Sequence, residues 1–322
     1  MDLATTYLGL SLRNPLVASA SPLTQSADRA IEMVEAGVSA VVLHSLFAEE
    51  IEHPTPDADV PHFFENPAGP GAPRRYLELI EESVRSVDVP VIASINGTSR
   101  HGWTSFARRM QDAGAAAVEC NFYNVPRRTL GPGSDVEERL LDVIRALQQE
   151  LDVPVAIKLT PYFSSFGELA LRVAETGADG LVLFNRFLQP QIDTQTLTVA
   201  PTIGLSSSSD ARLPQTWIAL LREQLTISLA GTSGVETASD LVAYLLAGAD
   251  VVECASAFLR NGIQYAAVLL DGLDEWGNEQ GFGSVDEFRG RLAVPWDVDP
   301  QDYTREGYVA ALQTARRSYL FR

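Results

Sequence analysis

Lysine is nearly absent from this chain: Lys158 is its only copy, and the rest of its 24 basic residues are arginines. Lys158 lies in the apolar run VPVAIKLTP (153–161), which is typical of a buried parallel strand. An ammonium on a flexible stem can approach a ring atom or form an imine, whereas arginine's planar fork suits carboxylates and phosphates. We therefore predict a catalytic role for Lys158.

Cysteine and histidine are also scarce, with two and four copies. Cys120 and Cys254 each lie in an apolar run, which indicates buried thiols rather than a disulfide framework, an iron–sulfur cluster or a zinc site. His53, His62 and His101 fall in predicted loops or at a helix start and are expected to face solvent. Because their spacing does not match that of metal ligands, we predict no metal.

Long apolar runs and a positive balance of charge are missing too. No run reaches about 18 apolar residues, and the N-terminus MDLATTYLGL lacks the basic flank and hydrophobic core of a signal peptide. We therefore expect a cytoplasmic protein that does not enter the membrane. The net charge of −18 and the pI of 4.6 argue against nucleic acid and anionic membranes as partners, since both would repel such a surface.

Two short phrases alternate along the chain. One is a helix end, a glycine and a hydrophobic strand, and it occurs as AGVSAVVLHS (36–45), AGAAAVECNF (113–122), TGADGLVLFN (176–185) and AGADVVECAS (247–256). The other is a hydrophobic strand alone, and it occurs as NPLVASAS (14–21), VPVIASIN (89–96), VPVAIKLT (153–160) and LTISLAGT (225–232). Interleaved, they give eight strands separated by amphipathic segments of helical length, such as 100–112, 135–150, 165–176 and 237–247. This alternation predicts an α/β protein with a (β/α)8 TIM barrel at about 14–265, in a single domain of residues 1–322.

Three segments fall outside this rhythm. Residues 46–72 are rich in proline and acid, and residues 187–212 contain the strand-like TLTVAP and a serine run. Both follow strands at the end of the barrel that carries catalytic residues, so both are candidate lids or pocket walls, although the serine run also fits a flexible linker. Residues 277–322 contain no barrel strand, and we expect this C-terminal extension to pack beneath or beside the barrel.

Every predicted strand ends in polar residues at or just past its carboxyl end, where barrel enzymes carry their chemistry. We expect these side chains to converge on one pocket. They are Ser19, Ser21, His44, Ser45, Ser94, Asn96, Asn121, Tyr123, Lys158, Thr160, Asn185, Arg186, Thr232 and Ser256.

The loops after the last two strands have the features of an anion site. The sequence AGTSGVETASD (230–240) places glycines before a helix N-terminus, where backbone amides and the helix dipole favour negative charge. Barrels commonly hold a phosphate in these loops, and the turn CASAFLRNG (254–262) adds the Ser256 hydroxyl. The sequence therefore predicts a phosphate anchor across the barrel mouth from Lys158.

A phosphate anchor, several amides and one ammonium suit flavin mononucleotide (FMN). Its pyrimidine edge needs polar partners, and its N1 gains negative charge on reduction, which Lys158 would stabilise. The same groups without flavin suit a Schiff-base lyase or aldolase with Lys158 as the nucleophile. Residue chemistry alone leaves both open.

Seven segments resemble those of a known family: NPLVASASP (14–22), VVLHSLF (41–47), VIASINGTS (91–99), VECNFYNVP (118–126), VAIKLTP (155–161), LVLFNRFLQPQIDTQTL (181–197) and the span 230–262. Over about residues 1–265 the chain resembles the FMN-dependent dihydroorotate dehydrogenase family, and more closely its divergent bacterial branch. The resemblance implies that Lys158 contacts the flavin pyrimidine edge and that Asn96, Asn121 and Asn185 line the flavin pocket. It also implies further flavin contacts from Ser19, Ala20, Ser45, Gly231, Ser233, Gly234, Ala255 and Ser256.

The chain departs from the family pattern at positions that bear on the substrate. The family's base is a cysteine or serine in the loop after the fourth strand, where this chain has Asn124, and an amide cannot take that proton. His44 and Ser45 replace a lysine-serine pair, and Arg186 replaces a small hydroxyl residue and could bind a carboxylate. Tyr123 and His44 are the candidate replacement bases, of which His44 titrates nearer neutral pH.

We therefore predict an FMN-dependent oxidoreductase that transfers a hydride between FMN and a small anionic substrate and acts on a CH–CH group. Asn124 disfavours dihydroorotate oxidation in pyrimidine biosynthesis. A soluble electron acceptor or a separate redox partner must complete the cycle, and the resemblance extends to a homodimer. The alternatives are a Schiff-base lyase or aldolase using Lys158, and a flavin-binding protein without turnover.

Overall fold

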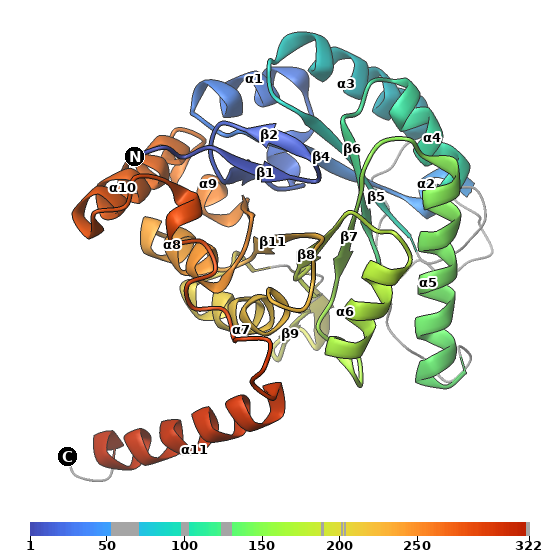
Figure 1. Cartoon of the computed structure of the whole chain (residues 1–322). Coiled ribbons are helices and arrows are strands. Elements are labelled where there is room, and N and C mark those ends of the chain that lie inside the picture. Colours follow the sequence, from blue (N-terminus) through green and yellow to red (C-terminus); the bar gives the residue numbers. More distant parts are fainter. Residues whose placement is uncertain are drawn as a thin grey trace.

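The structure is a computed structural model that describes residues 1–52, 71–97, 103–123, 131–187, 190–200, 202 and 204–319. Eight parallel strands close into a barrel in the order β11-β12-β3-β4-β5-β6-β7-β8 (Figure 1). The strands are β3 (Leu16–Ala18), β4 (Ala40–Phe47), β5 (Val91–Asn96), β6 (Ala117–Asn121), β7 (Val155–Leu159), β8 (Gly180–Leu183), β11 (Ser228–Thr232) and β12 (Val251–Cys254). The predicted barrel is therefore confirmed.

Helices that connect successive strands surround the barrel in the described part of the chain (Figure 1). They are α1 (Ala27–Glu35), α3 (Ala72–Ser86), α4 (Trp103–Asp112), α5 (Gly133–Glu150), α6 (Phe166–Glu175), α7 (Arg212–Leu221) and α8 (Ala238–Ala247), and α10 (Tyr265–Gln280) follows the last strand. The short helices α2 (Ala48–Glu52) and α9 (Ser256–Asn261) follow β4 and β12. None of these helices, nor any other in the described ranges, is long and apolar enough to cross a membrane.

The glycine of the recurring phrase ends a helix and turns the chain into the next strand. Gly248 shows the mechanism: its φ of 116° is left-handed, and its amide donates to the Tyr244 and Leu245 carbonyls at the end of α8. A glycine adopts this conformation without the penalty that a Cβ atom brings. The phrase therefore predicted the position of each following strand.

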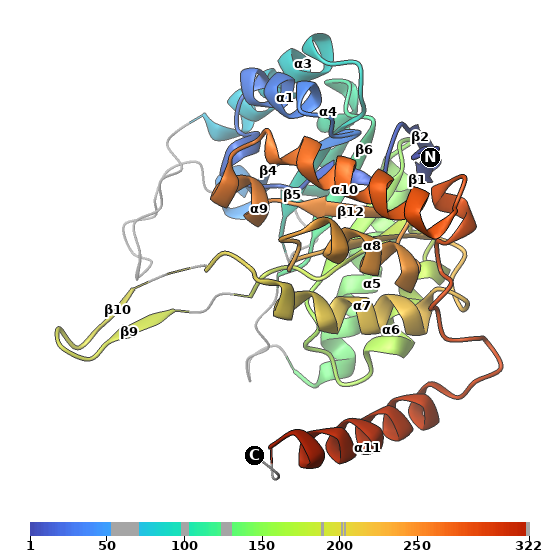
Figure 2. The ribbon, with the colours of Figure 1, turned by 90° about the vertical axis from the view of Figure 1, so that its left-hand side faces the viewer.

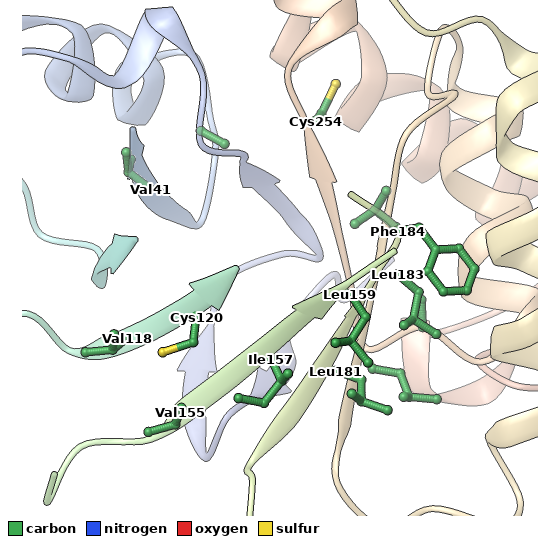
Figure 3. Packing of buried hydrophobic residues seen from close by; sticks show 14 of the residues in the cluster. Val41, Val118, Cys120, Val155, Ile157, Leu159, Leu181, Leu183, Phe184 and Cys254 are labelled. Carbon is green, nitrogen blue, oxygen red and sulfur yellow. The ribbon is translucent and has the colours of Figure 1, made fainter. Parts of the chain in front are cut away.

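The strands alternate between two cores, as the period of two requires. On β6 and β7, Val118, Cys120, Val155 and Ile157 face the helices, where Figure 3 shows them among the outer apolar residues. Ala117 and Ala156 face the barrel interior instead. The next inward positions along these strands are Glu119 and Lys158.

The N-terminal hairpin of β1 (Thr5–Tyr7) and β2 (Leu10–Leu12) contributes to the interior core. Tyr7, Leu8 and Leu12 are buried against inward residues from the amino-terminal halves of the barrel strands. This hairpin thus belongs to the apolar layer below the polar residues of the strand ends.

Both cysteines are free, buried thiols, as predicted. Burial raises the pKa of Cys254 to about 12, and burial followed by the charge of Glu119 raises the pKa of Cys120 as well. Both side chains are therefore neutral at physiological pH and packed as small apolar groups.

Two elements extend away from the barrel (Figure 2). The hairpin of β9 (Gln191–Asp193) and β10 (Thr198–Ala200) realises the strand predicted at TLTVAP. Helix α11 (Pro300–Tyr319) is exposed along nearly its whole length, so the expectation that the C-terminal extension packs on the barrel was wrong for α11. It holds for the residues before it, because the Gly290 and Leu292 amides donate to carbonyls of α8.

Candidate active site

A cavity of about 1320 Å³ opens at the carboxyl ends of the barrel strands. All eight strands contribute to its lining, either from their last residues or from the residue that follows them. Of the residues predicted for the site, the cavity brings together Ser19, Ala20, His44, Ser45, Asn96, Asn121, Tyr123, Lys158, Asn185, Arg186, Ser233, Gly234, Ala255 and Ser256. Asn124 lies outside the described residues, as do His53, His62 and His101.

Ser94 and Thr160 are predicted pocket residues that do not line the cavity, and neither does Gly231. A Cβ atom built there would lie 2.3 Å from the Tyr244 ring, which packs directly against the backbone of β11. The Tyr244 hydroxyl in turn donates to the carbonyls of Thr232 and Ser233 and holds the turn after β11. The structure therefore gives this glycine a packing role behind the pocket wall.

Lys158 lies at the inner end of the cavity and contacts two carboxylates. Its Nζ is 2.8 Å from Glu253 Oε2 and 3.2 Å from Glu119 Oε1, and 3.3 Å from Ser19 Oγ. Ser19 also donates to Glu253 Oε2 over 3.0 Å. Lys158 is 5% exposed and the two glutamates 1% each, so the whole group is closed off from bulk water except through the cavity.

Sequence reasoning missed Glu119 and Glu253. Both occupy the middle of the tripeptide Val-Glu-Cys, once in VECNF and once in VECAS, within otherwise apolar strands. In a strand that also carries the inward residues Ala117 and Asn121, Glu119 must face the barrel interior. A charged residue repeated at the inward register of two barrel strands was the signal that could have revealed the pair.

The ion cluster shifts the titration of its members. Burial alone would lower the pKa of Lys158, but the charges of Glu119 and Glu253 and their hydrogen bonds raise it above its usual range. For Glu119, burial and then the nearby charge of Glu253 raise the pKa to about 8, although Lys158 acts in the opposite direction. Lys158 is thus a firmly held cation, and Glu119 keeps a proton more readily than an ordinary carboxyl group does.

Amide and hydroxyl groups form a second polar band along the neighbouring strand ends. Asn185 Nδ2 donates to Asn121 Oδ1 over 3.0 Å, and the hydroxyls of Ser45 and Ser94 lie 2.8 Å apart. Asn96, the last residue of β5, lines the same cavity. Amides can serve as donors or acceptors, so this band suits a flat ligand with several polar ring atoms.

His44 has the properties of a neutral proton acceptor. Its ring contacts Tyr76 edge-on at 5.1 Å, and its Nδ1 is buried without a hydrogen-bond partner among the described residues. Burial lowers its pKa below 6.5, although a hydrogen bond with the Thr24 backbone opposes this shift. His44 thus places an uncharged imidazole at the cavity wall, with a buried nitrogen that has no partner among the described residues.

Aromatic side chains and one arginine border the cavity near Asn185. Tyr123 stacks on Phe187 with a centroid distance of 5.4 Å. Arg186 forms an ion pair with Asp210 at 3.1 Å and donates to the Gly204 carbonyl over 2.9 Å. Its charge is therefore partly compensated within the protein, but its Nε is buried and has no partner in the described part of the chain.

The predicted anion site brings together the turn after β11 and the start of α9. The Gly234 amide donates to Ser206 Oγ over 2.9 Å, and Ser206 in turn donates to Ser256 Oγ from its amide and from its hydroxyl, both over 3.0 Å. Arg260 donates to the Ser206 carbonyl. The serine run is therefore an ordered part of the pocket wall at this point, rather than a flexible linker.

A comparison with family models matches residues 2–276 to dihydroorotate dehydrogenase. The chain belongs to the dihydroorotate dehydrogenase family. It is thus a member of a family of oxidoreductases, and the match covers the barrel and ends within α10, so that α11 lies beyond it.

Curated relatives in this family are moderately similar over nearly the whole chain. The catalytic subunit of dihydroorotate dehydrogenase B (NAD(+)) from Methanothermobacter thermautotrophicus is 28% identical over 89% of this chain and 97% of its own. The corresponding subunit from Thermoplasma acidophilum is 26% identical over 90% of this chain and 98% of its own. Subunit PreA of the NAD-dependent dihydropyrimidine dehydrogenase of Escherichia coli is 25% identical over 90% of this chain and 76% of its own.

The ion cluster makes a stability prediction for this family member. Lys158→Met keeps an unbranched stem of similar length but leaves the buried carboxyl groups without their cation. Removing one partner of a buried ion pair costs about 3 to 5 kcal/mol, so we expect a loss of that size in the free energy of unfolding at neutral pH, measured by urea denaturation. Arg29→Met is the control, because Arg29 pairs with Glu32 on the exposed face of α1 and should cost less than about 1 kcal/mol. Equal losses in the two variants would contradict the structural role of the cluster.

Proposed function

We propose that this family member is an FMN-dependent oxidoreductase that transfers a hydride between FMN and a small anionic substrate. The observation that carries the proposal is the buried ammonium of Lys158 at the inner end of a large cavity, with amide groups beside it and a glycine-containing turn among the other walls. Pockets for single ligands measure about 300 to 1000 Å³, so a volume of about 1320 Å³ accommodates a cofactor together with a small substrate.

The residues of the cavity fit FMN in kind. Lys158, Asn96, Asn121 and Asn185 would hold the polar edge of the ring. The turns at Gly234 and Ser256 would hold the phosphate in place of Ser206, with which both now form hydrogen bonds. When bound, FMN supplies the hydride-accepting ring, which protein side chains do not have. Ser19 is the one uncharged acceptor of the three around Lys158, so its contact is the one that a ligand atom would replace.

Two residues are proposed to act on the substrate. His44 would take a proton, because its Nδ1 has no partner in the described structure and its lowered pKa keeps the ring neutral at physiological pH. Arg186, which lines the cavity, would bind an anionic group through its guanidinium while Asp210 pairs with the same side chain. Dihydroorotate oxidation stays outside the proposal, since Asn124 occupies the expected base position.

The state of Lys158 argues against the Schiff-base alternative. Imine formation needs a neutral amine, and enzymes obtain one by lowering the lysine pKa. The two carboxyl groups raise the pKa of Lys158 instead, so the free amine is rare at neutral pH. A soluble acceptor or a separate electron-transfer protein would reoxidise the flavin, and the relatives named above are themselves subunits.

The first test is the absorption spectrum of the purified protein, with the released chromophore identified by chromatography. We expect the near-ultraviolet and blue bands of an oxidised flavin and elution as FMN. A colourless protein that also fails to take up added FMN would overturn the proposal. A flavin that no substrate reduces under anaerobic conditions would instead favour a binding protein without turnover.

Lys158→Arg tests the assignment of the ammonium. A guanidinium is larger and carries its donors in a fixed plane, so it cannot take the same position between Glu119, Glu253 and Ser19. We expect FMN binding at least about tenfold weaker, or about 1.4 kcal/mol, by fluorescence titration of the stripped protein. The reverse exchange on the surface, Arg29→Lys, should leave the affinity unchanged; unchanged affinity in Lys158→Arg would remove the proposed contact.

His44→Gln and Tyr123→Phe test the proton acceptor. Loss of a general base slows the step that it serves by about 10² to 10⁴-fold, so His44→Gln should slow anaerobic flavin reduction by a working substrate to that extent with normal flavin content. In the unmodified protein this rate should fall only as the pH drops below 6.5 and the imidazole becomes charged, because burial lowers its pKa. If Tyr123→Phe alone is slow, the tyrosine is the base; if neither variant is slow, both assignments fail.

A further inference from the structure

Three ionisable side chains share one water-poor volume inside the barrel. If Lys158, Glu119 and Glu253 were all charged, the group would carry a net charge of −1 with exposures of 5% or less. An uncompensated buried charge costs several kcal/mol even after local relaxation. A change of protonation within the group removes that cost.

The hydrogen bonds of the cluster are incomplete in a way that points to a missing proton. Lys158 contacts Glu119 Oε1 and Glu253 Oε2, while Glu119 Oε2 and Glu253 Oε1 are buried with no hydrogen-bond partner among the described residues. Both carboxyl groups contact the same Lys158 Nζ, so they face one small buried volume. Two ionised carboxylates can only accept, whereas one proton on either of them creates a donor for the other.

We propose that Glu119 and Glu253 share one proton at neutral pH, so that the cluster is electrically neutral and the pair sets the charge that Lys158 presents to the cavity. The first part stands on the geometry of the ion cluster. The second part rests on the proposed function, since it concerns the FMN ring edge held at Lys158. Glu119 and Glu253 are then positioning residues that act through Lys158.

The titratable groups around the pair are already protonated and do not take up this proton. Tyr7 lies on the side of the N-terminal hairpin, and Tyr76 of α3 contacts the outer side of β5. Burial raises the pKa of both tyrosines, so they remain neutral phenols. Cys120, next to Glu119 on β6, is likewise a neutral thiol.

More distant charges do not replace this proton. Asp250, which acts on Tyr7 from the start of β12, is paired with Arg222 at 3.0 Å and with Arg289 at 3.7 Å. Glu50, which acts on Tyr76, lies at the cavity mouth. Lys158 is therefore the cation in direct contact with the pair, and its single charge balances one carboxylate, not two.

The pair has a definite signature in the pH dependence of stability. The folded protein keeps the Glu119 proton up to a pH of about 8, whereas an ordinary glutamate loses it near 4.5. The folded state therefore binds more protons between these values, and the contribution of this group to stability falls as the pH rises from 4.5 through 8. Glu119→Gln should abolish that decline, because an amide donates to Glu253 at every pH.

The experiment measures thermal unfolding midpoints of the protein as purified, from pH 4.5 to pH 9. Glu119→Gln and Glu253→Gln should both fold, since each leaves one amide, one carboxylate and Lys158. In both variants the unfolding midpoint should no longer fall as the pH rises from 4.5 through 8. Glu175→Gln, on the exposed end of α6, is the matched control and should follow the unmodified protein. A decline in Glu119→Gln equal to that of the unmodified protein would overturn the proposal, as would loss of stability at every pH with an unchanged slope.

A second readout separates a shared proton from a purely structural contact. Infrared spectra with isotope-labelled glutamate should show a protonated carboxyl band at pH 7 that is lost above pH 8 and is missing in either single variant. Absence of this band at pH 7 in the unmodified protein would refute the shared proton.

FMN affinity measured on the same samples should weaken several-fold as the pH rises through 8, but not in Glu119→Gln. If no FMN binds, the proposed function fails while the stability and infrared results still decide the proton. If the FMN affinity depends on pH in the same way in Glu119→Gln and in the unmodified protein, the pair does not set the charge that Lys158 presents to the cavity.

Discussion

The contact of Lys158 with two buried carboxyl groups is the constraint around which the barrel interior is organised. Ionised groups at this depth are stable only when they compensate one another, so β6, β7 and β12 must bring Glu119, Lys158 and Glu253 to the same level. β6 and β7 are neighbours, but β12 reaches them only because the sheet closes into a barrel. The cluster thus divides the interior into an apolar layer that includes Tyr7 and a polar layer that opens into the cavity.

Much of the fold could be predicted because local signals and tertiary structure agree. Helices that end on a glycine specify where four of the strands begin, hydrophobic runs mark the other four, and the closed barrel uses all eight predicted strands. Lys158 could be found from its rarity alone. Glu119 and Glu253 were missed because their role depends on which face of the strand they occupy and on a partner about 130 residues away, and no local pattern encodes that second condition.

The extensions were harder to predict for a related reason. The strand in TLTVAP was predicted because its residues favour a strand locally. Its pairing with β9, in a hairpin that extends away from the barrel, is a tertiary feature that this local pattern does not encode. Residues 277–322 contain no barrel strand and were expected to pack on the barrel, yet the side chains of helix α11 are exposed nearly throughout. Gly231 shows the same limit: the Tyr244 ring, 13 residues later in the chain, leaves no room for a Cβ atom at Gly231, and no local pattern encodes that packing.

The donor count explains why one lysine persists in a chain that otherwise uses arginine. An ammonium has three N–H donors, and Lys158 has three acceptors around it: Glu119 Oε1, Glu253 Oε2 and Ser19 Oγ. A guanidinium has five donors in a rigid plane. In the same site, some of these donors would be buried and unpaired, or they would donate to the remaining oxygens, Glu119 Oε2 and Glu253 Oε1. A hydrogen bond from arginine to those oxygens would prevent them from carrying the shared proton, and both glutamates would stay ionised. Lysine leaves the two oxygens free to bind a proton, so the charge of the cluster at the bottom of the cavity can change.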